Sequence, residues 1–187
     1  MANYATSNIR TVALVGQGGS GKSTLAEALL LASGAIKESG TVERGTTVSD
    51  FDPLEKSWQH SLRASVVHLD TQDTRVHLID TPGFPDFLGQ AIGALDAVET
   101  AAVVVSAQSG IEMVASRMMD WAAKRRLCRL VIINKIDERV ERRFALPAFT
   151  PTHGRPPMLC VIRARFHLIM LLSILIGWLV SAPSWAL

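Results

Sequence analysis

Cysteine is scarce in this chain, which holds only two among its 187 residues. Cys128 and Cys160 lack the close spacing of metal-ligating pairs, and two thiols are too few for a disulfide framework. The opening residues, MANYATSNIR, contain no apolar core, so we expect no leading export signal. The sequence also shows no internal repeat. These absences exclude disulfide scaffolds, cysteine-rich metal modules and repeat proteins.

Charge and proline are unevenly distributed along the chain. Residues 138–187 contain six arginines, no lysine and two glutamates, and they hold five of the eight prolines. Before that point acidic residues slightly outnumber basic ones, in a composition ordinary for an α/β protein. We therefore predict an incomplete domain over 1–137, an irregular Arg/Pro-rich segment over 138–165 and a hydrophobic tail over 166–187.

Apolar runs of strand length alternate with stretches of helical periodicity. Strands are predicted at 11–17, 64–70, 74–80, 100–107 and 127–135, and helices at 25–32, 85–98 and 111–125. The stretch 34–60 has no strong period and is expected to be a long loop. This alternation predicts an α/β fold whose mostly parallel sheet is covered by helices on both faces, with ligands bound at the carboxyl ends of the strands.

The stretch GQGGSGKST lies between the first predicted strand and the first predicted helix. It matches the P-loop pattern G-x-x-x-x-G-K-[ST], in which successive main-chain N–H groups and a helix N-terminus surround phosphate. We expect Lys22 to reach the terminal phosphates and the Ser23 hydroxyl to ligate Mg²⁺. The predicted phosphate-binding residues are Gly16, Gly18, Gly19, Ser20, Gly21, Lys22, Ser23 and Thr24. The fold class is therefore a P-loop NTPase.

A second motif, Asp80-Thr81-Pro82-Gly83, ends an apolar strand. A carboxylate at a strand end of a P-loop protein holds Mg²⁺, so Asp80 is a predicted metal residue, acting through water. The main-chain N–H of Gly83 is then available to a γ-phosphate. By itself this tetrapeptide would indicate only a turn.

The third motif is Asn134-Lys135-Ile136-Asp137, at the end of the last predicted strand. A carboxylate here can accept two hydrogen bonds from guanine, whereas adenine lacks that pair of donors. We therefore predict a guanine site at Asn134, Lys135 and Asp137, with GTP or GDP and Mg²⁺ as cofactors.

Three stretches, GQGGSGKSTLAEALLLASGAI, TTVSDFDPLEKSWQHSL and RVHLIDTPGFPDF, give the chain a family resemblance. They resemble the N-terminal GTP-binding domain of elongation factor G and its paralogues, over about residues 10–137. Asp86 and Phe87, in the form D-T-P-G-x-x-D-F, are typical of that group. The resemblance implies a cytoplasmic translational GTPase that couples hydrolysis to a task on the ribosome.

The sequence departs from this family at the residue that positions the attacking water. Elongation factors usually carry His after D-T-P-G, whereas Phe84 stands here and can neither accept a hydrogen bond nor transfer a proton. Gly19 stands where the family's P-loop often has Asp. The catalytic residue is thus unknown, and binding is better supported than fast hydrolysis. His60 and His77 are expected to be surface or strand histidines rather than catalytic ones.

The effector loop departs as well, because the family's R-G-I-T, whose Thr binds Mg²⁺ and γ-phosphate, is absent. Gln59-His60-Ser61-Leu62 is the best local match, which makes Ser61 the predicted third metal residue. Thr46 and Thr47 are alternatives, and so is a site without any of these hydroxyls.

After Asp137 we find no sixth strand, no further helix and no base-closing Ser-Ala loop, so the sheet is expected to be incomplete at its C-terminal edge. The apolar core of the tail, 168–180, is short for a membrane span of about 20 residues. Three interpretations stay open. The first is a frame change or truncation near Asp137 that leaves a product without activity. The second is a membrane anchor that makes a tethered GTP-binding switch, and the third is a divergent final helix.

Overall fold

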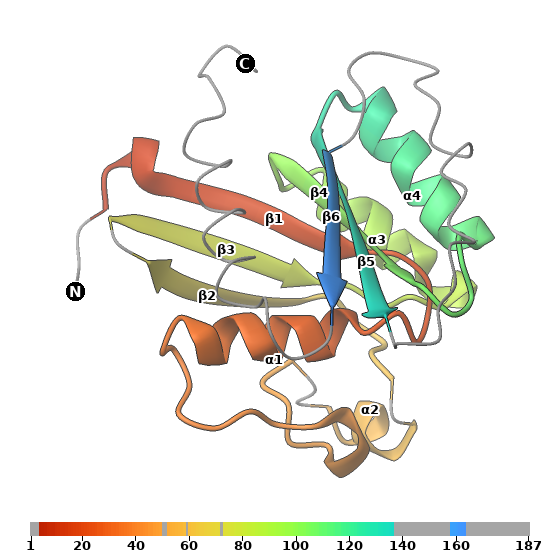
Figure 1. Cartoon of the computed structure of the whole chain (residues 1–187), viewed down its shortest axis with the longest axis horizontal. Helices are drawn as coiled ribbons and strands as arrows, with labels where there is room; N and C mark the ends of the chain where they lie inside the picture. Colours follow the sequence, from red (N-terminus) through yellow and green to blue (C-terminus); the bar gives the residue numbers. More distant parts are fainter. Residues whose placement is uncertain (1–3, 50–51, 59, 72, 137–157, 164–187) are drawn as a thin grey trace.

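The computed structural model describes residues 4–49, 52–58, 60–71, 73–136 and 158–163, and these form one six-stranded sheet with its helices (Figure 1). The strands are β1 (Ile9–Val15), β2 (Ser65–Thr71), β3 (Thr74–Asp80), β4 (Thr100–Ser106), β5 (Cys128–Ile136) and β6 (Met158–Arg163). Their order across the sheet is β2-β3-β1-β4-β5-β6. β2 pairs with β3 antiparallel, and the other neighbours are parallel. The predicted mostly parallel α/β sheet is confirmed.

Helices cover both faces of the sheet, as the alternation predicted. Those described are α1 (Lys22–Ala32), α2 (Pro53–Trp58), α3 (Leu88–Leu95) and α4 (Met113–Lys124), with 3-10 turns η1 (Thr6–Asn8), η2 (Val42–Arg44) and η3 (Pro85–Phe87). Val12 and Leu14 of β1 pack in one core cluster with α1, while Ala13 and Val15 pack in a second with α3 and α4. Because strand side chains alternate between faces, one short apolar strand fills both clusters.

The sheet has a topological switch point at β1. The chain builds the β2–β3 hairpin on one side of β1 and then returns to place β4 on the other side (Figure 1). In open α/β sheets ligands bind outside the carboxyl ends of the strands at such a point. The loop that follows β1 is the P-loop, so the topology places this loop at the expected position.

The expectation that no strand follows Asp137 is wrong. β6 (Met158–Arg163) pairs in parallel with β5, from Leu130 opposite Met158 to Ile136 opposite Arg163, with a register shift between Ile133 and Ile136. The run MLCVIR is short and follows two prolines, so no period marks it within an Arg/Pro-rich segment. The exposed edge of β5 offers main-chain partners to such a run. Asp137, the rest of 138–165 and the tail 166–187 lie outside the described residues.

The stretch 34–60 is not wholly irregular, as had been expected, because it contains η2 and α2. The start of α2 has a local cause. Pro53 stands at the first helical position, and the Asp52 carboxyl oxygen Oδ1 accepts a hydrogen bond from Leu54 N at 2.9 Å. Asp-Pro followed by Glu55 is therefore a sequence pattern that predicts the start of a helix.

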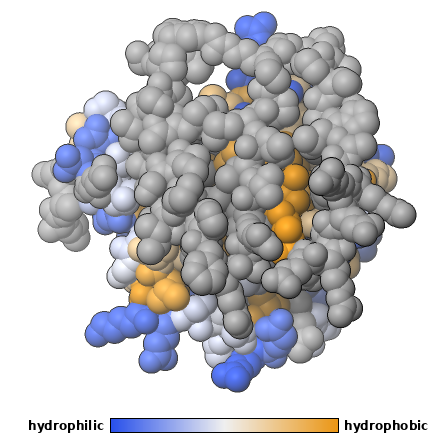
Figure 2. All heavy atoms as spheres, in the orientation of Figure 1, coloured by the Kyte–Doolittle hydropathy of each residue, from blue (hydrophilic) through white to orange (hydrophobic). Residues whose placement is uncertain are grey.

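In the view of Figure 2, hydrophilic side chains of the described residues lie at the margin and apolar ones nearer the middle. Within the part of the chain that the structure describes, no helix has the length and apolar character needed to cross a membrane.

Candidate functional site

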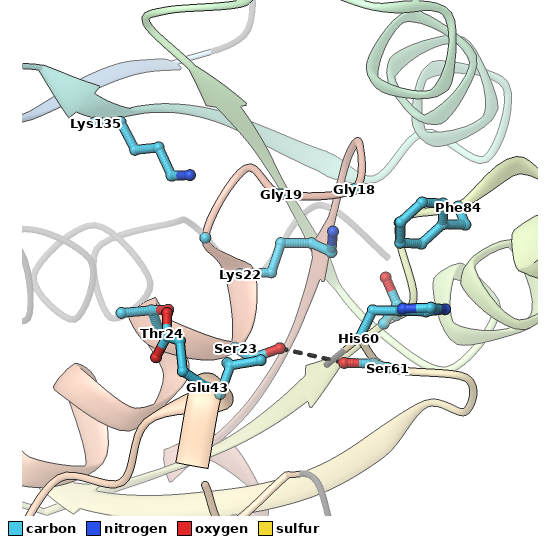
Figure 3. Close-up of a pocket in the computed structure, with 14 residues that line it drawn as sticks. Gly18, Gly19, Lys22, Ser23, Thr24, Glu43, His60, Ser61, Phe84 and Lys135 are labelled. Carbon is cyan, nitrogen blue, oxygen red and sulfur yellow. Dashed lines mark hydrogen bonds between the residues drawn. The ribbon is translucent and has the colours of Figure 1, made fainter. Parts of the chain in front are cut away.

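A cavity of about 290 Å³ opens at the carboxyl ends of β1 and β3 (Figure 3). Its walls are formed by the P-loop, η2, the segment before β2, the turn after β3 and the end of β5. The predicted site residues among its lining are Gly18, Gly19, Gly21, Lys22, Ser23, Thr24, Ser61, Gly83 and Lys135. Residues from all three motifs therefore meet at one cavity.

The shape of the P-loop depends on glycine at its first position. Gly16 has a φ of 134°, a backbone conformation that other residues rarely adopt. A Cβ there would also overlap the carbonyl oxygen of Val104, in the neighbouring strand β4. The loop can therefore turn away from β1 only because this position carries no side chain.

Lys22 lies inside this loop rather than in solvent. Its side chain is 6% exposed, and Nζ donates hydrogen bonds to the carbonyl oxygens of Gly16 and Gln17 at 3.0 and 2.9 Å. Burial lowers the pKa of Lys22 to about 8, and the nearby negative charge of Asp80 offsets part of this effect. The ammonium group therefore stays charged at neutral pH and lies at the floor of the cavity.

The D-T-P-G turn packs directly on the P-loop. A Cβ at Gly83 would overlap both Lys22 Nζ and the main-chain nitrogen of Gly18. The Thr81 hydroxyl donates to the carbonyl oxygen of Leu14 at 2.7 Å, which fixes the start of the turn to β1. The two phosphate motifs, far apart in sequence, are thus in contact around the lysine ammonium.

Oxygen groups suited to Mg²⁺ gather beside this lysine. The Oγ atoms of Ser23 and Ser61 are 3.3 Å apart (Figure 3), and Asp80, at the end of β3, is 1% exposed. Hydroxyl and carboxyl oxygens are the hard ligands that Mg²⁺ prefers. The donor set therefore fits this ion.

The structure also separates Ser61 from the other candidates of the effector loop. Ser61 lines the cavity. Thr46 is exposed, and its hydroxyl oxygen accepts a hydrogen bond from Thr41 N at 3.0 Å. Thr47 is buried outside the cavity lining. Of these three hydroxyls, the one that meets Ser23 is that of Ser61.

The third motif is joined to the P-loop through Asn134. Its side-chain Nδ2 donates to the carbonyl oxygen of Ser20 at 3.0 Å, and a Cβ on Gly21 would overlap this amide. Lys135 is exposed at the rim of the cavity, with a φ of 57°. Asp137 lies outside the described residues. Of the three predicted base-binding residues, the two that the structure describes lie beside the P-loop.

Two buried glutamates that were not predicted from the sequence hold residues 37–63, here called the effector segment. Glu27 of α1 accepts main-chain hydrogen bonds from Gly40, at 3.0 Å, and from Val48. Glu55 of α2 accepts from Leu62 N at 2.8 Å and from Arg63 N at 3.0 Å. Glu27 lies among apolar residues in LAEALLLA, and this position predicts a buried polar side chain.

Comparison with known proteins agrees with this geometry. Residues 7–148 match the family described as the elongation factor Tu GTP binding domain, which is most of the chain. The chain belongs to this family. An elongation factor G-like protein from Mycobacterium tuberculosis is 37% identical to it over 147 residues, 78% of this chain and 21% of that protein. The chain of this GTP-binding domain thus spans about a fifth of the length of that relative.

Solved structures support the same fold. A crystal structure of a protein from Thermus thermophilus matches this GTP-binding domain with a TM-score of 0.68 and 44% identity, over 70% of this chain and 20% of that one. Elongation factor SelB from Methanococcus maripaludis, solved with the GTP analogue GppNHp, has a TM-score of 0.72 at 18% identity. That match covers 93% of this chain and 34% of the SelB chain, and it concerns the fold alone. By sequence the chain is similar to part of an elongation factor G-like protein, and by fold it is similar to these solved structures.

At the place of the family's usual His, the GTP-binding domain has the Phe84 ring, which is 41% exposed and packs against Gly18. His60 lies beside it, with ring centroids 4.5 Å apart; it is partly exposed and lines the cavity (Figure 3). His77 lies on β3 opposite His68 of β2, as a strand histidine. Sequence reasoning could not find the place of His60, because a loop of no clear period carries it.

Proposed function

We propose that the chain binds GTP and GDP together with Mg²⁺ and hydrolyses GTP, as the nucleotide-binding part of a translational GTPase that acts on the ribosome. The observation that carries this proposal is the contact of the P-loop and the D-T-P-G turn around the Lys22 ammonium. Such a cationic, glycine-lined floor is suited to the terminal phosphates of a nucleotide.

At the phosphate end, the main-chain N–H groups from Gly18 to Thr24 would donate to phosphate oxygens. Lys22 would exchange its two carbonyl partners for the β- and γ-phosphates. The main-chain N–H of Gly83 would donate to the γ-phosphate, since Gly83 is the residue of the D-T-P-G turn that lies against Lys22. Gly16 would act by shaping the loop.

The metal residues would be Ser23 and Ser61, directly, and Asp80, through water. Bound Mg²⁺ supplies positive charge that stabilises the triphosphate and its transition state. The proximity of the two serine hydroxyls supports their joint use. Ser61 belongs to the effector segment held by Glu27 and Glu55, so metal binding would also fix this segment on the site.

At the base end, Asn134 and Lys135 would flank the guanine and Asp137 would accept its two N–H donors. The hydrogen bond from Asn134 to Ser20 supports this proposal, because it ties the base motif to the phosphate motif. We propose 1–137 as the nucleotide-binding unit, with β6 extending its sheet, and a cytoplasmic location shared with ribosomes.

Fluorescence titration with mant-GTP and mant-GDP tests the nucleotide proposal. We expect both to bind and unlabelled ATP to compete at least about 100-fold more weakly, because adenine would leave the Asp137 carboxylate unpaired. Equal competition by ATP would contradict the guanine site. Cosedimentation with ribosomes, with a non-hydrolysable GTP analogue against GDP, tests the partner: more chain in the ribosome pellet with the analogue is expected.

The metal proposal needs its own variants. Chelation of Mg²⁺ by EDTA should weaken mant-GTP binding by the unchanged chain. Ser23→Ala should lose most of this Mg²⁺ dependence, whereas Ser7→Ala, an exposed serine before β1, should keep it. An unchanged Mg²⁺ response in Ser23→Ala would remove Ser23 from the metal site.

A further inference from the structure

Phe84 leaves one wall of the cavity without a hydrogen-bonding side chain where hydrolysis would need one. Its ring packs against Gly18, next to Gly83, and Gly83 in turn lies against the Lys22 ammonium. Phe84 therefore borders the end of the cavity that the γ-phosphate would occupy. A water molecule that attacks phosphorus there needs an acceptor for one of its hydrogens.

His60 is the side chain that reaches this wall. Its ring lies 4.5 Å from that of Phe84, between centroids, and Figure 3 shows it beneath the Phe84 ring at the same side of the cavity. The ring of Trp58 also lies near it, at 5.7 Å between ring centroids. The imidazole thus lies near two aromatic rings while it lines the cavity.

The tautomer of His60 follows from its main-chain contact. Nδ1 lies 2.8 Å from the carbonyl oxygen of Trp58. A carbonyl oxygen only accepts, so Nδ1 must carry the proton, and in the neutral ring Nε2 is then an acceptor. The local geometry therefore presents an acceptor nitrogen on a ring fixed in position.

Other cavity-lining side chains fit this role less well. Lys22 only donates, and the Thr81 hydroxyl donates to Leu14. Ser23 and Ser61 are assigned to the metal in the proposed function. Thr24 and Glu43 lie on the far side of Ser23 from Phe84, as Figure 3 shows. Among the described lining residues, His60 is the acceptor nearest the Phe84 wall.

We propose that His60 is a catalytic residue of GTP hydrolysis, accepting through Nε2 a hydrogen bond from the attacking water. The inference rests on the proposed GTPase function. The water oxygen bonds to the γ-phosphorus, the bond from that phosphorus to the β,γ-bridging oxygen breaks, and its electron pair leaves with GDP. The proton that the water loses ends on a phosphate oxygen of the products, so His60 orients the water without keeping its proton.

Two substitutions at position 60 separate this role from packing. His60→Asn keeps a group at the place of Nδ1 but has nothing at Nε2, whereas the longer His60→Gln offers an acceptor oxygen near that place. Single-turnover hydrolysis should fall about 100-fold in His60→Asn. His60→Gln should recover most of the rate, and His68→Ala, on the exposed face of β2, should match the unchanged chain.

Mant-GTP affinity and the ring tautomer complete the test. The affinity of His60→Asn should stay within about twofold of the unchanged chain, since a positioned water adds little to ground-state binding. ¹⁵N NMR of the free chain should show the Nδ1–H tautomer of His60. Hydrolysis by His60→Asn at the unchanged rate, loss of GTP affinity in parallel with rate, or an Nε2–H tautomer would each overturn the proposal. Failure of the unchanged chain to bind mant-GTP would instead refute the GTPase function, and this role with it.

Discussion

The side-chain amide of Asn134 donates a hydrogen bond to the main-chain carbonyl oxygen of Ser20, over 3.0 Å. This contact joins the end of β5 to the phosphate-binding loop after β1, across 114 positions of the sequence. It also lies against Gly21, the residue before α1, where a Cβ would overlap the amide. The base motif and the phosphate motif are therefore in direct contact, through a hydrogen bond and close packing.

Asn134→Ala should weaken GTP and GDP binding by the same factor. One hydrogen bond to the loop is worth about 1 kcal/mol, which corresponds to roughly fivefold in affinity for each nucleotide. The two nucleotides share the loop and the base, and the variant touches neither Gly83 nor Ser61. Parallel mant-GTP and mant-GDP titrations measure this, and a loss confined to GTP would contradict the structural link.

Gly83→Ala should act on the triphosphate end instead. The added methyl would overlap Lys22 Nζ and the main-chain nitrogen of Gly18, so the turn must move away from the P-loop. We expect mant-GTP affinity to fall about tenfold or more while mant-GDP affinity falls less, because GDP has no γ-phosphate to meet Gly83. Gly89→Ala is the matched control, since nothing lies within 4 Å of a Cβ there.

The sequence was sufficient for the phosphate end of the site because its chemistry is local. Glycines that let the chain turn, a lysine and a serine at fixed offsets determine the P-loop by themselves, and the structure brings Lys22, Ser23 and Gly83 together as the pattern predicts. The parallel strands also follow from apolar runs that are buried on both faces, and the hairpin at 64–80 follows from two strand-length runs separated by a short turn.

What the sequence did not predict depends on contacts between distant segments. Glu27 is buried because main-chain N–H groups of the effector segment need an acceptor, and no period in the chain encodes that pairing. His60 lines the cavity because Phe84 and Trp58 hold it there. β6 forms because the edge of β5 offers partners to a run that alone is too short to be recognised.

Glu27→Ala should loosen the effector segment without removing the P-loop. It would leave the main-chain N–H groups of Gly40 and Val48 without their acceptor, at a cost of about 3 kcal/mol in the free energy of unfolding. We expect a lower urea midpoint and faster proteolysis within residues 37–63. Glu27→Gln, which keeps one acceptor oxygen, should lose less, and Glu38→Ala, at an exposed position, should lose nothing measurable. Equal effects of the Glu27 and Glu38 variants would show that the buried contacts are not what holds the segment.

Lys22 should make the stability of the nucleotide-free chain increase with pH. Burial places its pKa in the folded chain at about 8, below the ordinary value of 10.5. Below about pH 8 both folded and unfolded states hold the proton, so the full cost of burying the charge is present. Between about pH 8 and pH 10.5 the folded state has released the proton while the unfolded state still holds it. Over this range the free energy of unfolding increases by up to about 3 kcal/mol.

Urea unfolding at about pH 7 and about pH 9.5, compared between the unchanged chain and Lys22→Met, isolates this effect from other titrating groups. The gain with pH should be larger in the unchanged chain, because the methionine has no proton to release. Bound nucleotide should reverse the direction in which the free energy of unfolding changes with pH, because phosphate oxygens stabilise the ammonium form of Lys22 and raise its pKa. GDP affinity of the unchanged chain should then decrease as the pH rises above about 8. A nucleotide affinity that stays constant over this range would place the phosphates away from Lys22.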